Sequence, residues 1–206
     1  MNNKDFYSQY INVFLNQNAK LNLISKNDEK YLWEKHIYDS LSIENFFNKY
    51  LKPDINNPKT KLLDIGTGGG FPAVPIAITY PEIEVFALDS IRKKINAIEN
   101  IKLELNLQNL HTICDRAEKI NGKFSIITSR AVAPLNVIID YAMPLLDKNG
   151  YFVAYKSLKA SEEIFEAKNT LKKHNAQVID LISYELPLKE NHTRNLVIIN
   201  RKKIRG

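Results

Sequence analysis

Four glycines within five positions follow an aspartate in the segment Asp64–Gly70, and this is the stretch of the chain best suited to hold a ligand. The apolar run before it predicts a buried strand, and Pro72 after it is typical of the first turn of a helix. Glycines let the backbone turn sharply and approach a bound molecule closely. Free N–H groups at the start of the helix favour electron-rich groups, so the pattern predicts a nucleoside site.

Two classes of nucleoside ligand fit this turn. Residues 68–73 match the variant of the dinucleotide fingerprint that ends in alanine. Counted from the strand, Asp64-x-Gly66-x-Gly68-x-Gly70 resembles the first motif of the class I S-adenosylmethionine-dependent methyltransferases. Asp64 favours the methyl donor, because the donor's amino group and sulfonium are cationic and it carries no pyrophosphate. A turn without a ligand is the third interpretation, which the conformational cost of four glycines disfavours.

Two acidic segments after the next strands would complete such a site. Asp89 ends the second predicted strand, where a carboxylate can accept hydrogen bonds from both ribose hydroxyls. It could instead cap the helix that starts at Ile91. Backbone N–H groups of Asp115–Glu118, after the third strand, could contact adenine, although such a segment alone is more often an exposed loop. Both segments belong to the carboxyl edge of a parallel sheet, where ligands gather.

The segment Ser129–Pro134 follows the fourth predicted strand, where class I methyltransferases keep reaction-specific residues. It lacks the Asn/Asp-Pro-Pro-aromatic sequence that is common in amino-group methyltransferases. Methylation of a pyrimidine carbon 5 needs a cysteine, but Cys114 lies one strand away and is better explained as a core residue. What remains is Arg130, a cation that cannot act as a base. Guanine N7 has a free lone pair and needs no base, so positioning would supply most of its catalysis.

Arg130 and Lys156 are therefore the predicted catalytic residues. Arg130 could brace the donor, contact guanine O6 and N7, or form a structural ion pair. Lys156 ends the fifth strand and could meet an RNA phosphate or be a solvated strand end. His36, Tyr38 and Asp39 form a polar cluster, in which His36 is expected to be a hydrogen-bonding residue on a helix face or between helices. No two histidines have metal-ligand spacing, so we expect no metal.

The hydrophobic pattern predicts the elements that position these residues. Residues 3–50 show helical spacing, which predicts a helical cap over residues 1–52. Residues 52–59 contain prolines and asparagines and predict a loop. From Thr60 on, short apolar strands alternate with helical stretches, as in βαβ units.

The last two predicted strands, 178–184 and 195–200, have only a loop between them and should be antiparallel. A doubly wound α/β sheet with a terminal antiparallel hairpin is the Rossmann-like arrangement of class I methyltransferases. A dinucleotide fold continues with parallel strands instead. We therefore expect one compact unit, in which the cap packs on a methyltransferase domain over residues 60–206.

Composition sets further bounds on this chain of 206 residues with a net charge of +6. Its single cysteine excludes an internal disulfide framework and a multi-cysteine metal site, which fits a reducing cytoplasm. We find no signal-peptide pattern and no apolar run long enough to span a membrane, so a cytoplasmic protein without a membrane partner is expected. Residues 189–206 contain six basic residues and one acid. This concentration of charge is expected of a phosphate-contacting surface, or of a solvated tail.

Together these motifs resemble the RsmG family, also called GidB, the bacterial 16S ribosomal RNA guanine-N7 methyltransferases. The resemblance runs in order over nearly the whole chain, through Asn22–Ser25, His36–Leu41, Leu63–Pro72, Leu88–Ser90, Arg116–Glu118, Ser129–Ala131 and Tyr155–Lys156. It implies that S-adenosylmethionine methylates a guanine in the decoding-region loop of 16S ribosomal RNA, as bare RNA or in the small subunit, and we expect a monomer. By position, it implies donor contacts at Gly66, Phe71, Ser90, the backbone of Ala117 and Glu118, and Arg130.

The chain departs from this family at two positions of the turn. The family usually has alanine or proline in place of Gly69 and glycine in place of Ala73, whose methyl group would crowd helix against strand. Many relatives also have a longer basic tail. Two other functions stay open: an NAD-dependent oxidoreductase, indicated by residues 68–73, and a non-catalytic RNA-binding factor on the same fold.

Overall fold

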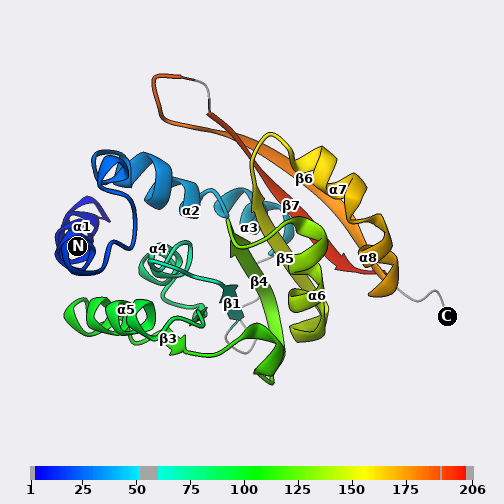
Figure 1. Ribbon diagram of the computed structural model, residues 1–206, viewed down its shortest axis with the longest axis horizontal. Coiled ribbons are helices and arrows are strands. Elements are labelled where there is room, and N and C mark those ends of the chain that lie inside the picture. Colours follow the sequence, from blue (N-terminus) through cyan, green and yellow to red (C-terminus); the bar gives the residue numbers. More distant parts are fainter. Residues whose placement is uncertain (1–2, 52–59, 191, 203–206) are drawn as a thin grey trace.

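The computed structural model describes residues 3–51, 60–190 and 192–202, and a seven-stranded sheet forms its centre (Figure 1). The strand order is β3-β2-β1-β4-β5-β7-β6. All neighbours pair in parallel except β7, which is antiparallel to both β5 and β6. This confirms the predicted doubly wound sheet with its terminal hairpin. The strands are β1 (Lys61–Ile65), β2 (Glu84–Leu88), β3 (Leu110–Ile113), β4 (Phe124–Arg130), β5 (Leu146–Lys156), β6 (Ala176–Leu186) and β7 (His192–Arg201).

Helices cover both faces of the sheet and enclose two hydrophobic cores. One face carries α4 (Ala73–Thr79) and α5 (Arg92–Glu104). The other carries α6 (Leu135–Leu145), α7 (Ala160–Glu166) and α8 (Lys168–Lys173). The helical stretch before the terminal hairpin is divided into α7 and α8, because the chain turns between them at the fully buried Ala167. A short 3₁₀ helix, η3 (Ala117–Lys119), follows β3.

The N-terminal segment forms the predicted helical cap, although it is less regular than the spacing indicated. It consists of α1 (Asn3–Leu21), the 3₁₀ helix η1 (Lys26–Tyr31), the π-helix η2 (Trp33–Tyr38), α2 (Asp39–Leu41) and α3 (Glu44–Tyr50). Its buried aromatic residues belong to the same core as α4, α5 and one sheet face, whereas Tyr31, Trp33 and Tyr38 are exposed. The predicted loop at residues 52–59 lies outside the described residues.

The cap rests directly on the turn after β1. The ring of Phe14, on α1, meets that of Phe71 with centroids 5.1 Å apart, and His36 approaches Phe71 at 5.0 Å. A side chain at Gly69 would lie 3.3 Å from Leu23 of the cap. In the described part of the chain, no helix has both the length and the apolar character needed to cross a membrane.

Candidate functional site

Three glycines of the turn adopt left-handed backbone conformations: Gly66 at φ +71°, Gly68 at φ +60° and Gly70 at φ +93°. Their surroundings differ. A Cβ at Gly66 would lie 2.4 Å from Val132, and one at Gly70 would lie 2.6 Å from Val74. At Gly68 the nearest atom would be 4.0 Å away, so this position faces open space. The turn is thus shaped by close approach at two glycines and left open at the third.

Asp89 anchors this turn to the end of β2. One of its carboxylate oxygens accepts a hydrogen bond from the Gly68 N–H (3.0 Å), and the other accepts one from the Ile91 N–H (2.9 Å) at the start of α5. The Lys94 ammonium lies 3.8 Å away. Asp89 therefore fixes the residue that precedes α5, but it does not cap the helix, whose N-cap residue Ile91 makes no side-chain capping bond. It also borders a cavity, as the ribose-binding interpretation requires.

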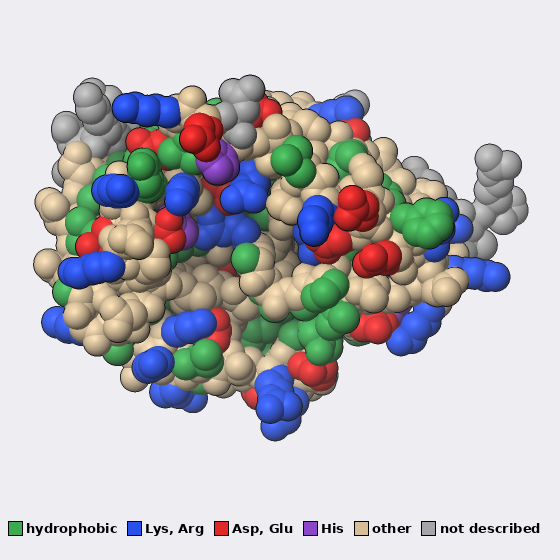
Figure 2. Space-filling view, turned by 45° about the horizontal axis from the view of Figure 1, so that its top comes forward, with side chains coloured by type: hydrophobic (Ala, Val, Ile, Leu, Met, Phe, Trp, Pro, Cys, Tyr) green, Lys and Arg blue, Asp and Glu red, His purple; other side chains and the backbone are tan. Residues whose placement is uncertain are grey.

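Two cavities meet over the glycine turn. The larger, of about 950 Å³, lies between the cap, the turn, the loop after β4 and the β6–β7 hairpin. The smaller, of about 530 Å³, is bordered by Asp89, Ser90, Ala117 and Glu118. Gly66, Lys94, Ala131 and Val132 line both. Figure 2 shows the hollow surrounded by charged side chains of both signs.

This geometry suits an elongated ligand whose middle lies over Gly66. A nucleoside would occupy the smaller cavity, with Asp89 beside the ribose and the η3 backbone beside the base. Its other end would reach over the turn into the larger cavity, where Phe71 and Arg130 lie. Eight of the ten predicted cofactor residues, at the ends of the four strands β1 to β4, thus line one continuous space.

Two predicted cofactor residues lie elsewhere. Asp64 is fully buried beneath the turn, accepts a hydrogen bond from the Thr128 hydroxyl (2.9 Å) and lines neither cavity. Gly70 lines neither cavity and packs against Val74. Both therefore support the turn from below, and the direct donor contact expected of Asp64 is not provided by this structure. Burial raises the pKa of Asp64 to about 7, although the hydroxyls of Thr67 and Thr128 oppose the shift.

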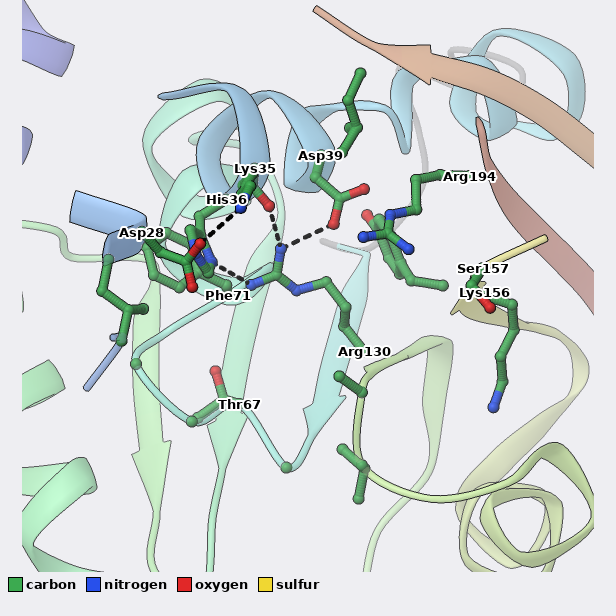
Figure 3. Close-up of a pocket in the computed structure, with 18 of the residues that line it drawn as sticks. Asp28, Lys35, His36, Asp39, Thr67, Phe71, Arg130, Lys156, Ser157 and Arg194 are labelled. Atoms are coloured by element: carbon green, nitrogen blue, oxygen red, sulfur yellow. Dashed lines mark hydrogen bonds and ion pairs between the residues drawn. The ribbon is translucent and has the colours of Figure 1, made fainter. Parts of the chain in front are cut away.

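Arg130, at the end of β4, is held by the cap (Figure 3). Its guanidinium donates to the backbone oxygen of Lys35 (3.1 Å), to the Asp39 carboxylate (2.8 Å) and to Nδ1 of His36 (3.1 Å). It also lies over the ring of Phe71, 5.3 Å from the centroid. Arg130 therefore forms the ion pair that one interpretation predicted, while its side chain also lines the larger cavity.

Asp39 and Tyr184 complete this network, and the sequence analysis did not assign their roles. The second oxygen of Asp39 accepts a hydrogen bond from the hydroxyl of Tyr184 on β6 (2.6 Å). Burial, together with the adjacent Asp39 charge, raises the pKa of Tyr184 well above its ordinary value, so the hydroxyl keeps its proton. One carboxylate thus joins the cap, β4 and the terminal hairpin.

Replacing Tyr184 with phenylalanine should release one side of Asp39. Because Arg130 keeps its own bonds, we expect kcat to fall by about threefold to tenfold while donor affinity stays within about twofold. Steady-state methyl transfer and donor titration would measure this. Tyr151→Phe, on β5 and lining neither cavity, is the matched control. Equal kinetics of the two variants would contradict a positioning role for Tyr184.

His36 is neutral in this arrangement. Burial, reinforced by the charge of Arg130, lowers its pKa to about 4. The unprotonated Nδ1 can therefore accept the hydrogen bond from Arg130. His36 thus makes a hydrogen bond, but its partner lies on strand β4, 94 positions away, and not on another helix.

Asp64 and His36 should give opposite slopes to the pH dependence of stability. The raised pKa of Asp64 means that the folded state binds the proton more tightly, so stability falls as pH rises from about 4 to about 7. The lowered pKa of His36 means that the unfolded state binds more protons between about 4 and 6.5, so stability rises with pH there.

Replacing one of the two groups should leave only the other to determine this pH dependence of stability. As pH increases from 4 to 6.5, we expect the free energy of unfolding of Asp64→Asn to increase by on the order of 2–3 kcal/mol more than that of wild type. Over the same interval, the free energy of unfolding of His36→Gln should decrease by a similar amount relative to wild type. Urea unfolding at a series of pH values would measure both. Identical profiles for the two variants and the wild type would show that neither group titrates as the structure indicates.

Lys156 lies in the larger cavity but is already bound. Its ammonium donates to the backbone oxygen of Ala133 (2.9 Å) and to Glu163 (2.6 Å), and its side chain is only 10% exposed. The same Glu163 oxygen accepts the N–H of Leu135 at the start of α6 (2.7 Å). This arrangement fixes the loop after β4, so Lys156 is placed to hold that loop as well as to border the substrate space.

Metal chemistry finds no support in the part of the chain that the structure describes, where no cluster of three or more potential protein ligands occurs. Cys114 is partly buried at the end of β3, with its sulfur 3.9 Å from the backbone oxygen of Ser90. It lines neither cavity, so a nucleophilic role has no structural basis. Cys114 packs against the hydrophobic core, which agrees with the interpretation as a core residue, although its burial is only partial.

The strand order, the glycine turn and the acidic end of β2 define the fold of the class I S-adenosylmethionine-dependent methyltransferases. Solved structures agree. Ribosomal protein L11 methylase from Lactobacillus delbrueckii subsp. bulgaricus superposes with a TM-score of 0.57 at 18% identity, covering 80% of this chain and 77% of that one. M. jannaschii TYW2 in complex with AdoMet gives 0.57 at 17% identity, with the same coverage.

The chain belongs to the GidB family, rRNA small subunit methyltransferase G, whose family model matches residues 3–197. It is 35% identical to ribosomal RNA small subunit methyltransferase G of Streptococcus agalactiae serotype V, over 97% of this chain and 84% of that protein. The protein of that name from Streptococcus pneumoniae serotype 19F is 34% identical, with the same coverage. The family confirms the predicted methyltransferase and supports neither the oxidoreductase nor the non-catalytic alternative.

Proposed function

We propose that this protein transfers a methyl group from S-adenosylmethionine to N7 of a guanine in the decoding-region loop of 16S ribosomal RNA. It would act as a monomer in the cytoplasm, on the RNA or on the small subunit. The observation that carries the proposal is the pair of cavities joined over Gly66, within a chain of the rRNA small subunit methyltransferase G family.

The residues fit the methyl donor. Gly68 presents open space above the turn, and Asp89 and the η3 backbone border a cavity large enough for adenosine. The donor, when bound, supplies an electrophilic methyl on a sulfonium. Gly66 lines both cavities, so the reacting centre belongs there.

The larger cavity is suited to a target without a proton to remove. Three of its four carboxylates, Asp28, Asp39 and Glu163, are each engaged by a cation, and Nδ1 of His36 is used by Arg130. The other two groups that could accept a proton, Glu166 and His192, are exposed to solvent. Guanine N7 needs no base, and attack in line with the departing sulfur requires only correct placement. Arg130 and Phe71 would fix the wall against which base and donor meet, and the cap would exclude water.

The test uses small subunits from a strain that lacks the endogenous enzyme, incubated with the protein and labelled donor. We expect about one methyl per subunit, mapped by chemical cleavage to N7 of a single guanine. Absence of label at any guanine N7 would overturn the proposal. Thermal stabilisation by S-adenosylhomocysteine, compared with NAD, would show separately whether donor binding survives.

A further inference from the structure

Five cations line the larger cavity, and four of them are neutralised. Lys35 pairs with Asp28 (2.8 Å), Arg130 with Asp39 (2.8 Å) and Lys156 with Glu163 (2.6 Å). Lys94 lies 3.8 Å from Asp89. The fifth cation is Arg194.

Arg194 has no ion pair or side-chain hydrogen bond within the described residues 3–51, 60–190 and 192–202, and Figure 3 draws it beside Arg130 without a marked interaction. The cavity's remaining carboxylate, Glu166, is exposed on α7 and forms no ion pair in this part of the chain. A partly buried guanidinium that faces a cavity without a partner is suited to an anion that arrives from outside.

The backbone around Arg194 is rigid. Arg194 pairs with Tyr184 in the β6–β7 ladder, and Asn195 beside it donates to the backbone oxygen of Ser157 (2.9 Å) and accepts from the Ser183 hydroxyl (2.8 Å). The side chain is therefore presented from a fixed strand. Because Tyr184 also holds Asp39, the same hairpin that carries Arg194 orients the network around Arg130.

Two anions could meet Arg194: the carboxylate of the methyl donor and a phosphate of the RNA. In the sheet order, β7 is separated from β1 by β4 and β5, a distance of about 14 Å at the usual strand spacing. The donor lies over the turn after β1, so its carboxylate belongs near that turn. The strand that carries Arg194 lies three positions along the sheet from that turn, so a phosphate of the target nucleotide is the anion that this position favours.

We propose that Arg194 binds a backbone phosphate of the target nucleotide and so holds the guanine over the donor. This inference rests on the proposed function. A guanidinium can grip two phosphate oxygens at once, which fixes the orientation of the nucleotide as well as its position. Arg194 would thus be a substrate-binding residue, while Arg130 belongs to the wall of the reacting centre.

Arg194→Ala, Arg194→Lys and the control Lys172→Ala would be compared in methyl transfer to unmodified small subunits. Lys172 is exposed on α8, away from both cavities, and its loss changes the net charge equally. We expect Arg194→Ala to raise KM for the subunit by roughly 10-fold to 100-fold. The slope of the logarithm of the binding constant against the logarithm of salt concentration should become shallower by about one, as the loss of one phosphate contact requires. Arg194→Lys should recover part of the loss, and donor affinity should stay within about twofold.

Kinetics of Arg194→Ala equal to those of Lys172→Ala would overturn the inference. So would a fall in donor affinity, which would assign Arg194 to the donor's carboxylate, or a loss confined to kcat. Thermal stabilisation by S-adenosylhomocysteine shows that each variant is folded. If the wild-type protein itself fails to label the subunit, the proposed function fails; if only the Arg194 comparison fails, that function stands without this contact.

Discussion

Arg130→Ala is expected to lower methyl transfer by about 100-fold or more and to destabilise the fold. The substitution removes the bonds that tie the end of β4 to the cap and leaves the buried Asp39 carboxylate without its cation. Breaking a buried pair in this way typically costs about 3–5 kcal/mol. It also removes the wall that Arg130 and Phe71 form at the reacting centre, where misplacement of about 1 Å costs about 100-fold in rate.

A double variant separates the two effects. Arg130→Met with Asp39→Asn removes the cation and the stranded charge together, and the asparagine oxygen can still accept from Tyr184. We expect this protein to regain most of the stability lost in Arg130→Ala, measured by urea unfolding, and to stay catalytically impaired. A stable double variant with wild-type turnover would show that Arg130 serves only in the structural ion pair and has no role in catalysis.

Gly66→Ala should lower donor affinity by about 30-fold or more while the protein still folds. A methyl group at this position would overlap Val132, whose side chain lines both cavities, and a left-handed backbone adds about 1–2 kcal/mol of strain. Val132 is 41% exposed, so it can move away from the new methyl, but it would move where the two cavities join. Calorimetric titration with S-adenosylhomocysteine measures the effect.

Two companion variants identify its cause. Gly68→Ala has similar backbone strain but no close neighbour, so it should weaken binding less unless the donor itself needs that space. Adding Val132→Ala to Gly66→Ala should restore part of the affinity by removing the overlap. Wild-type donor affinity in Gly66→Ala would show that the ligand does not pass over this residue.

The glycine turn and the sheet could be predicted because their signals are local. Glycines, a helix-starting proline and alternating strands and helices each restrict a few neighbouring residues, and the short link before β7 requires antiparallel pairing. Element ends were less accurate. β5 begins at Leu146, immediately after α6 ends at Leu145, and the hydrophobic pattern did not indicate that no loop separates them.

The partners of Arg130 could not be predicted, because Asp39 lies 91 positions away along the chain and Tyr184 is 145 positions from Asp39. Sequence spacing carries no information about such contacts. Asp64 shows a second limit. Four of the five residues of β1 are buried, since both sheet faces are covered, so the pattern could not show whether this carboxylate faces the ligand or the core.

The most direct measurement is a crystal structure of the protein with S-adenosylhomocysteine. We expect the sulfur over Gly66, the ribose beside Asp89, the adenine beside Ala117 and Glu118, and the amino-acid end over the turn toward Phe71. Adenine in the larger cavity, or a ligand bound away from the glycine turn, would contradict the placement of the reacting centre where the two cavities meet.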